Sequence, residues 1–173
     1  ARPTPTPSPP RPACVAMRDR DWAGALLQLQ ELRSARVQLS PSHYGAALKV
    51  CGAASQWRWA LSLLGEARSL SLDSVANYNN AINACGRGAQ YKQAEGLMEV
   101  MRQRRKLPNL ITYSIAISSC ARGGLYVQAL RLMKEMQQGG IVPDVVAYST
   151  AISACEKGNQ YEPALRLLDD MRR

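Results

Sequence analysis

The sequence predicts an all-α protein, an α-solenoid built from stacked helix-turn-helix repeats. Five columns of residues recur along the chain at the same intervals of 34, 35 and 35 residues. Inside each repeat the apolar residues follow the period of two amphipathic helices, and glycine-rich or polar turns separate these helices. Such a period is typical of supersecondary units that stack in a row and bury their apolar faces against their neighbours.

The recurring columns hold a tyrosine, a leucine or isoleucine, a cysteine, a second aromatic residue and an alanine. Their members in chain order are Tyr44, Tyr78, Tyr113 and Tyr148; Leu48, Ile82, Ile117 and Ile152; Cys51, Cys85, Cys120 and Cys155; Trp57, Tyr91, Tyr126 and Tyr161; and Ala60, Ala94, Ala129 and Ala164. Because both aromatic columns lie on apolar helix faces, we expect them to pack in the core. The alanine column indicates a close approach of two helices.

The chain begins with two segments that match the repeat poorly. Residues 1–12 contain six of the ten prolines and predict an extended tail or linker. Residues 13–40 share only the second half of the register, through Trp22 and Ala25. We expect this segment to form a degenerate partial repeat.

Four repeats follow. Residues 41–74 form a divergent repeat, residues 75–109 and 110–144 form full repeats of 35 residues, and residues 145–173 form a repeat that is cut short. In 110–144, Tyr113 begins a first amphipathic helix, a glycine pair breaks it, and a second helical run precedes another glycine pair and a proline. We expect the four repeats to belong to a longer array.

Composition limits the classes of partner and chemistry. The chain has 22 Lys and Arg against 13 Asp and Glu, a net charge of +9 and a pI near 9.7. This excess favours polyanionic partners such as nucleic acids, although it does not establish one. The basic cluster at 102–106 could contact phosphates, or it could be a solvated helix end whose cations complement the helix dipole.

The five cysteines predict neither a zinc site nor a disulfide framework. There is no CxxC or CxxH pair, and His43 is the one histidine of the chain. Four cysteines share one column of the repeat, which indicates small apolar residues packed inside each unit. Free buried thiols are typical of a reducing compartment. We expect no metal and no cofactor.

The sequence also argues against an enzyme and against a membrane protein. No Gly-rich phosphate loop and no Ser/His/Asp or Cys/His arrangement is present. Glu162, Asp169 and Asp170 spread around one expected helix and are better explained as a solvated face than as a metal site. No apolar stretch reaches the length of a membrane span, and no secretory signal is visible.

The repeats resemble the 35-residue pentatricopeptide repeats. The resemblance is carried by Leu-Ile-Thr-Tyr-Ser at 110–114, by Gly-Ile-Val-Pro-Asp at 140–144, by the column that contains Met101 and Met136, and by Leu-Pro-Asn at 107–109. It covers residues 41–173 well and 13–40 loosely. It implies a right-handed α-solenoid.

The family resemblance further implies sequence-specific binding of single-stranded RNA, with one base read per repeat. It also implies a role in organellar RNA processing, stability or translation, and hence a chloroplast or mitochondrial location. A protein-interaction scaffold of the tetratricopeptide type, with protein partners, is the alternative that the residues leave open. RNA binding should weaken steeply with salt, whereas peptide binding in a groove need not.

By this resemblance, the fifth and the last residue of each repeat reach the edge of a base. The residues in these positions are Asn79 and Asn109 in repeat 75–109, Ser114 and Asp144 in repeat 110–144, and Ser149 in repeat 145–173. The first pair then favours a pyrimidine, C more than U, and the second pair favours G. Ser149 points to a purine. Gly45 stands at the reading position of repeat 41–74, so we expect that repeat to serve mainly as packing surface.

The resemblance assigns two further sets of residues. The second residues of successive repeats, Ala76, Ile111 and Val146, are expected to sandwich the bases through apolar contact. Three basic residues late in the first helices, Arg87, Arg122 and Lys157, are expected to approach phosphates, with a solvated helix end as the alternative.

Overall fold

The computed structural model describes residues 21–172, and within them it forms nine α-helices and no β-strand. The all-α prediction is confirmed. The expected tail at 1–12 and the start of the partial repeat lie outside the described residues. The helices are α1 (Trp22–Ser34), α2 (Pro41–Ala53), α3 (Trp57–Ser69), α4 (Val75–Arg87), α5 (Tyr91–Gln103), α6 (Leu110–Arg122), α7 (Tyr126–Gln138), α8 (Val145–Lys157) and α9 (Tyr161–Arg172).

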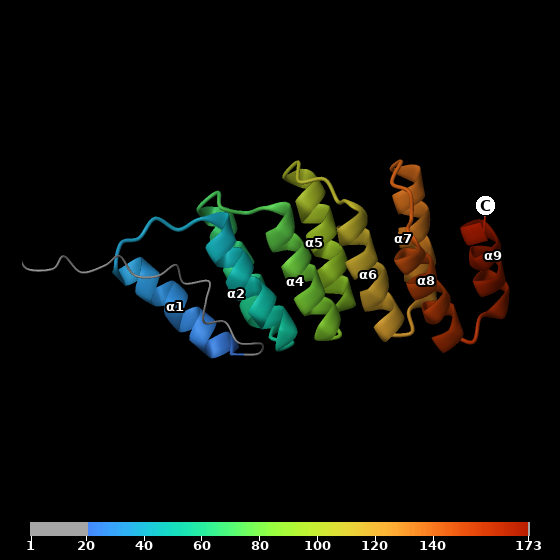
Figure 1. Ribbon diagram of the computed structural model, residues 1–173, viewed down its shortest axis with the longest axis horizontal. Helices are drawn as coiled ribbons and strands as arrows, with labels where there is room; N and C mark the ends of the chain where they lie inside the picture. The colour runs from blue at the N-terminus through green and yellow to red at the C-terminus, as the bar shows by residue number, and fades with distance from the viewer. Residues whose placement is uncertain (1–20, 173) are drawn as a thin grey trace, which may run out of the picture.

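The helices form a right-handed α-solenoid that runs from α1 at one end to α9 at the other (Figure 1). The first helices of the repeats, α2, α4, α6 and α8, pack on one another in sequence. Each second helix packs on the first helix of its own repeat and, where a further repeat follows, on the first helix of that repeat. The first helices therefore form a continuous layer along the solenoid.

The tyrosine and cysteine columns form much of the core, as their apolar register predicts. Tyr44 and Tyr78 are completely buried, and the four column cysteines are at most 7% exposed. One member of the second aromatic column departs from the expectation, because Tyr161 is 74% exposed. In the described part of the chain, no first helix of a further repeat packs against α9, so this ring lacks the cover that its equivalents have.

That cover is a glycine at the end of the next first helix. Trp57 lies against Gly88, and in the same register Tyr91 lies against Gly123. A Cβ atom added at Gly88 would stand 2.4 Å from Cδ1 of Trp57. The glycines thus allow the second helix of one repeat to seat its aromatic ring on the next repeat.

A polar contact also links neighbouring repeats. Arg102 of α5 donates a hydrogen bond to the Tyr113 hydroxyl of α6 at 3.4 Å and forms an ion pair with Glu135 of α7 at 3.0 Å. Arg33, Tyr44 and Glu66 repeat this arrangement between α1, α2 and α3. The contact holds three consecutive helices in a fixed register.

The junction of α3, α4 and α5 lacks the glutamate of this contact. Val100 stands where Glu66 and Glu135 stand in the other two, and the Nε of Arg68 is buried without a hydrogen-bond partner. An orphaned buried donor reduces stability. In place of the missing glutamate, the Tyr78 hydroxyl donates to the buried carboxylate of Asp73 at 3.2 Å, and this carboxylate pairs with Arg104.

Substituting Gly88 by alanine should destabilise the protein by about 1–3 kcal/mol, because the new methyl group overlaps the base of the Trp57 side chain. Gly65 is the matched control, because a methyl group there meets nothing within 4 Å. Gly65→Ala should stabilise its helix by roughly 0.5–1 kcal/mol. Urea unfolding measures both changes. Equal effects of the two substitutions would contradict the packing of the aromatic ring on the glycine.

Alkaline pH should destabilise the protein through its cysteines. Burial raises the pKa of Cys51 and Cys85 from 9.0 to about 11. Between these values the folded chain keeps protons that the unfolded chain releases. Each thiol should therefore lower the free energy of unfolding by about 1.4 kcal/mol per pH unit in this window. The stabilisation is fully present below pH 9 and is lost as the pH rises through 11.

Unfolding in urea at pH 8 to 11 measures this dependence. A Cys51→Ala/Cys85→Ala variant should show a shallower decline than the parent protein over the same range. An unchanged decline would mean that other groups, and not these thiols, carry the alkaline destabilisation.

Candidate nucleic-acid interface

A cavity of about 350 Å³ opens between the first helices α6 and α8. Four of the predicted site residues line it: Ile111 and Ser114 from α6, Val146 from α8, and Asp144 immediately before α8. The register of the repeat therefore brings together the two predicted readers of repeat 110–144 and the two residues predicted to sandwich its base.

The cavity has exposed apolar walls. Ile111 is 58% exposed and Val146 is 62% exposed, although both are large aliphatic side chains. Burying exposed aliphatic surface against another apolar surface lowers the free energy by roughly 25 cal/mol per Å². Two such side chains on neighbouring first helices can hold a flat ring between them without distinguishing one base from another.

The polar groups of the cavity offer hydrogen-bond acceptors. Ser114 uses its hydroxyl proton to donate to the carbonyl oxygen of Leu110 at 2.8 Å, which leaves its lone pairs for a ligand. Asp144 caps α8, and its Oδ1 accepts from the backbone N–H of Ala147 at 2.8 Å. An ionised carboxylate can only accept, so the site matches a ligand edge that carries donors.

The predicted readers of repeat 75–109 are arranged differently. Asn79 is only 6% exposed, and its Oδ1 accepts a hydrogen bond from the Thr112 hydroxyl at 2.7 Å. Asn109 caps α6, and its Oδ1 accepts from the backbone N–H of Thr112 at 3.1 Å. Ala76 is exposed at the start of α4, as a residue that contacts a base face must be.

Thr112 is not among the residues predicted from the sequence, although its hydroxyl contacts both Asn79 and Asn109. The spacing Asn109-x-x-Thr112 is a capping box, and this local signal marks the threonine as a partner of Asn109. Its contact with Asn79 crosses between two repeats. No local pattern in the sequence reveals that contact.

Ser149 lies exposed on α8 and donates to the carbonyl oxygen of Val145 at 2.6 Å, as Ser114 does to Leu110. The position equivalent to Asp144 falls after residue 173. Ser149 is therefore the predicted reader of this repeat for which the structure gives a position.

The three predicted phosphate contacts lie at the ends of the first helices. Arg87 donates to the carbonyl oxygen of Ala53 at 3.1 Å, and Arg122 donates to the Ser118 hydroxyl at 2.9 Å. Burial and the nearby charge of Arg87 lower the pKa of Arg122. A guanidinium has five N–H donors, so both arginines keep donors for an anion. Lys157 is exposed at the end of α8.

Two of the four basic residues of the cluster at 102–106 form ion pairs within the protein. Arg102 pairs with Glu99 and Glu135, and Arg104 pairs with the buried carboxylate of Asp73 at 3.2 Å. Arg102 and Arg104 thus have structural partners, which neither of the two alternatives for this segment included.

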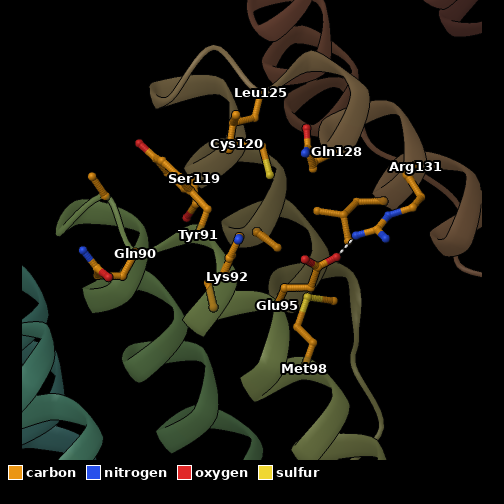
Figure 2. A pocket seen from close by; sticks show the side chains of 14 residues that line it. Gln90, Tyr91, Lys92, Glu95, Met98, Ser119, Cys120, Leu125, Gln128 and Arg131 are labelled. Carbon is orange, nitrogen blue, oxygen red and sulfur yellow. Dashed lines mark ion pairs between the residues drawn. The ribbon is translucent and has the colours of Figure 1, made fainter.

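A second hollow of about 450 Å³ lies on the side of the second helices, between α5, α6 and α7. Figure 2 shows the ion pair of Glu95 and Arg131 at this hollow, beside Gln128. In the equivalent place between α1 and α3, the rings of Trp22 and Trp59 lie 6.1 Å apart. Gln128 stands in the register of Trp59. The hollow therefore reflects a packing difference between two junctions.

The described residues hold no group of three or more His, Cys, Asp or Glu side chains that could bind a metal ion. Among the helices of residues 21–172, none is long and apolar enough to cross a membrane.

Comparison with solved structures identifies similar folds. Maize pentatricopeptide repeat protein PPR10 is 24% identical, with a TM-score of 0.72 over 88% of this chain and 22% of PPR10. PPR10 in complex with an 18-nt psaJ RNA element gives 18% identity and a TM-score of 0.75 over the same shares of the two chains. The PPR domain of Arabidopsis thaliana protein-only RNase P 1, in complex with tRNA, is 20% identical, with a TM-score of 0.73 over 88% of this chain and 81% of the domain.

This chain thus spans about a fifth of the length of PPR10. No curated protein matches it. Three family models do match: the PPR repeat family over residues 73–122, the PPR repeat over 111–141 and the pentatricopeptide repeat domain over 131–173. Together these matches run over more than half of the sequence, and the chain belongs to the pentatricopeptide repeat family.

Proposed function

We propose that the protein binds single-stranded RNA along the layer of first helices and reads one base per repeat. The observation that carries this proposal is the cavity between Ile111 and Val146, which has Ser114 and Asp144 at its polar end. Two apolar walls and a set of acceptors are the features that a stacked, edge-read base requires. The net charge of +9 supports an anionic ligand.

The chemistry of this cavity favours guanine. The Watson–Crick edge of guanine carries two donors, N1–H and the N2 amino group, whereas the edges of cytosine and adenine each pair a donor with an acceptor. Because Ser114 and Asp144 both present acceptors, they match the two donors of guanine. With a pyrimidine at repeat 75–109 and a purine at repeat 145–173, the expected core is pyrimidine–G–purine.

The similar structures support an RNA ligand, since PPR10 is in complex with an RNA element and the PPR domain of protein-only RNase P 1 is in complex with tRNA. We propose that this protein acts by covering its RNA segment, which blocks nucleases or competing RNA structures, and that it does so in an organelle. The function needs no catalytic step. A protein-binding scaffold of the tetratricopeptide type is the competing account.

Replacing Asp144 by asparagine should weaken the preference for guanine, because an amide offers a donor as well as an acceptor to the base. Asparagine also caps helices well, so the fold should persist. We expect the preference for G over C at this position to fall by about 5- to 150-fold, the equivalent of about 1–3 kcal/mol. Fluorescence anisotropy with two RNAs that differ only at this base measures the change.

Asp169→Asn, in the exposed acidic pair of α9, removes the same charge and serves as the control. It should leave the preference unchanged. An unchanged preference in Asp144→Asn as well would refute the reading role of Asp144.

The affinity for RNA should fall steeply with salt. If Arg87, Arg122 and Lys157 each neutralise one phosphate, log affinity should fall with log salt with a slope of about −2. Arg122→Gln should make the slope shallower by about 0.7. Arg166→Gln on α9, where Arg166 is exposed and lies 3.7 Å from Glu162, should not change the slope. Affinity for RNA that does not respond to salt would favour the scaffold account.

A further inference from the structure

We propose that Thr112, a residue of repeat 110–144, determines which pyrimidine the preceding repeat selects. The proposal rests on the proposed function of RNA reading. It concerns Asn79 and Asn109, the two readers that the resemblance assigns to repeat 75–109. The hydroxyl of Thr112 lies in the following repeat, and Thr112 is not one of the predicted site residues.

The Thr112 hydroxyl contacts both readers at once. Its Oγ1 lies 2.7 Å from Oδ1 of Asn79, 3.0 Å from Oδ1 of Asn109 and 3.2 Å from the backbone nitrogen of Asn109. Thr112 is completely buried, so water does not compete for these bonds. One side chain therefore controls how the two amides are oriented.

The hydrogen-bond donors around Thr112 determine the orientation of the Asn79 amide. The hydroxyl has a single proton to donate. The backbone N–H of Asn109 donates to Oγ1, and the backbone N–H of Thr112 already serves Oδ1 of Asn109 at 3.1 Å. The hydroxyl proton is therefore directed to Oδ1 of Asn79, which is also its shortest contact. This bond keeps the amide oxygen of Asn79 on the protein side.

The amide nitrogen of Asn79 is then left without a partner among the described residues. Among the described side chains, the polar atoms that are buried and lack a hydrogen-bond partner are Gln28 Oε1 and Arg68 Nε. The Nδ2 of Asn79 is not one of them, and no protein acceptor within the described residues bonds to it. It therefore reaches solvent and is available to donate to a base.

A hydrogen-bond donor on the ligand side of Asn79 distinguishes cytosine from uracil. Cytosine presents an unprotonated N3, which accepts a hydrogen bond, whereas N3 of uracil carries a proton and repels a donor. By fixing the Asn79 amide with its nitrogen outward, Thr112 favours C over U. Without the hydroxyl the amide can rotate and present its oxygen to uracil N3–H instead.

The junction between repeats 110–144 and 145–173 lacks an equivalent hydrogen bond. Ala147 occupies the position of Thr112 in the next repeat, and the reader Ser114 is oriented by the carbonyl oxygen of Leu110 in its own helix. The control by a residue of the following repeat is therefore specific to the base read by Asn79 and Asn109.

The test measures the ratio of affinities for two RNAs that differ only by C or U at the base assigned to repeat 75–109. Thr112→Val should lower this ratio by about five- to tenfold, the equivalent of one lost hydrogen bond. Thr112→Ser keeps the hydroxyl and should restore the ratio. Thr150→Val, which removes a hydroxyl that bonds only within α8, is the matched control and should leave the ratio unchanged.

A second measurement avoids any effect of the variants on folding. In the wild-type protein, replacing the cytosine by 3-deazacytidine removes the acceptor at position 3 and should lower the affinity to that of the uridine RNA. Retention of full affinity would overturn the proposal, and so would an unchanged C-to-U ratio in folded Thr112→Val. In either case an intact preference for guanine at the next base would show that the proposed function stands. Absence of RNA binding by the wild-type chain would overturn both.

Discussion

The structure depends on one constraint, the close packing of each first helix on the first helix of the next repeat. Small buried alanines make this approach possible, since Ala81, Ala116 and Ala151 share one register and are at most 4% exposed. A larger side chain there would push two repeats apart and change the spacing of every site on that layer. Two further contacts then fix the second helices relative to the first helices. They are the packing of aromatic rings on glycines and the arginine–tyrosine–glutamate contacts.

The candidate site is a consequence of this spacing. The cavity between Ile111 and Val146 exists because α6 and α8 present equivalent positions side by side. Its polar groups are ordinary elements of helix chemistry: Asp144 is a helix cap and Ser114 is bonded to its own backbone. Capping uses one oxygen of the carboxylate, and the other remains for a ligand. Local structure thus fixes the positions of these acceptors in the absence of a ligand.

The repeat register predicted the helices and the tyrosine and cysteine core, because both follow from periodicity. The grouping of Ser114 with Asp144 was instead implied by the resemblance to pentatricopeptide repeats. Contacts that break the period could not be predicted. Thr112 contacts Asn79 of the preceding repeat, and this contact does not recur, because Ala147 stands at the equivalent position of the next repeat. The ion pair of Arg104 with Asp73 and the exposure of Tyr161 also depend on which side chains meet in space.

Methyl NMR of the protein with a short pyrimidine–G–purine RNA tests the central claim most directly. A base held between Ile111 and Val146 should move the methyl signals of both residues upfield through its ring current. Val127, 57% exposed on the second helix α7, serves as an internal reference and should not move. RNA binding that leaves Ile111 and Val146 unshifted, or that shifts Val127 equally, would contradict the placement of the base between the first helices.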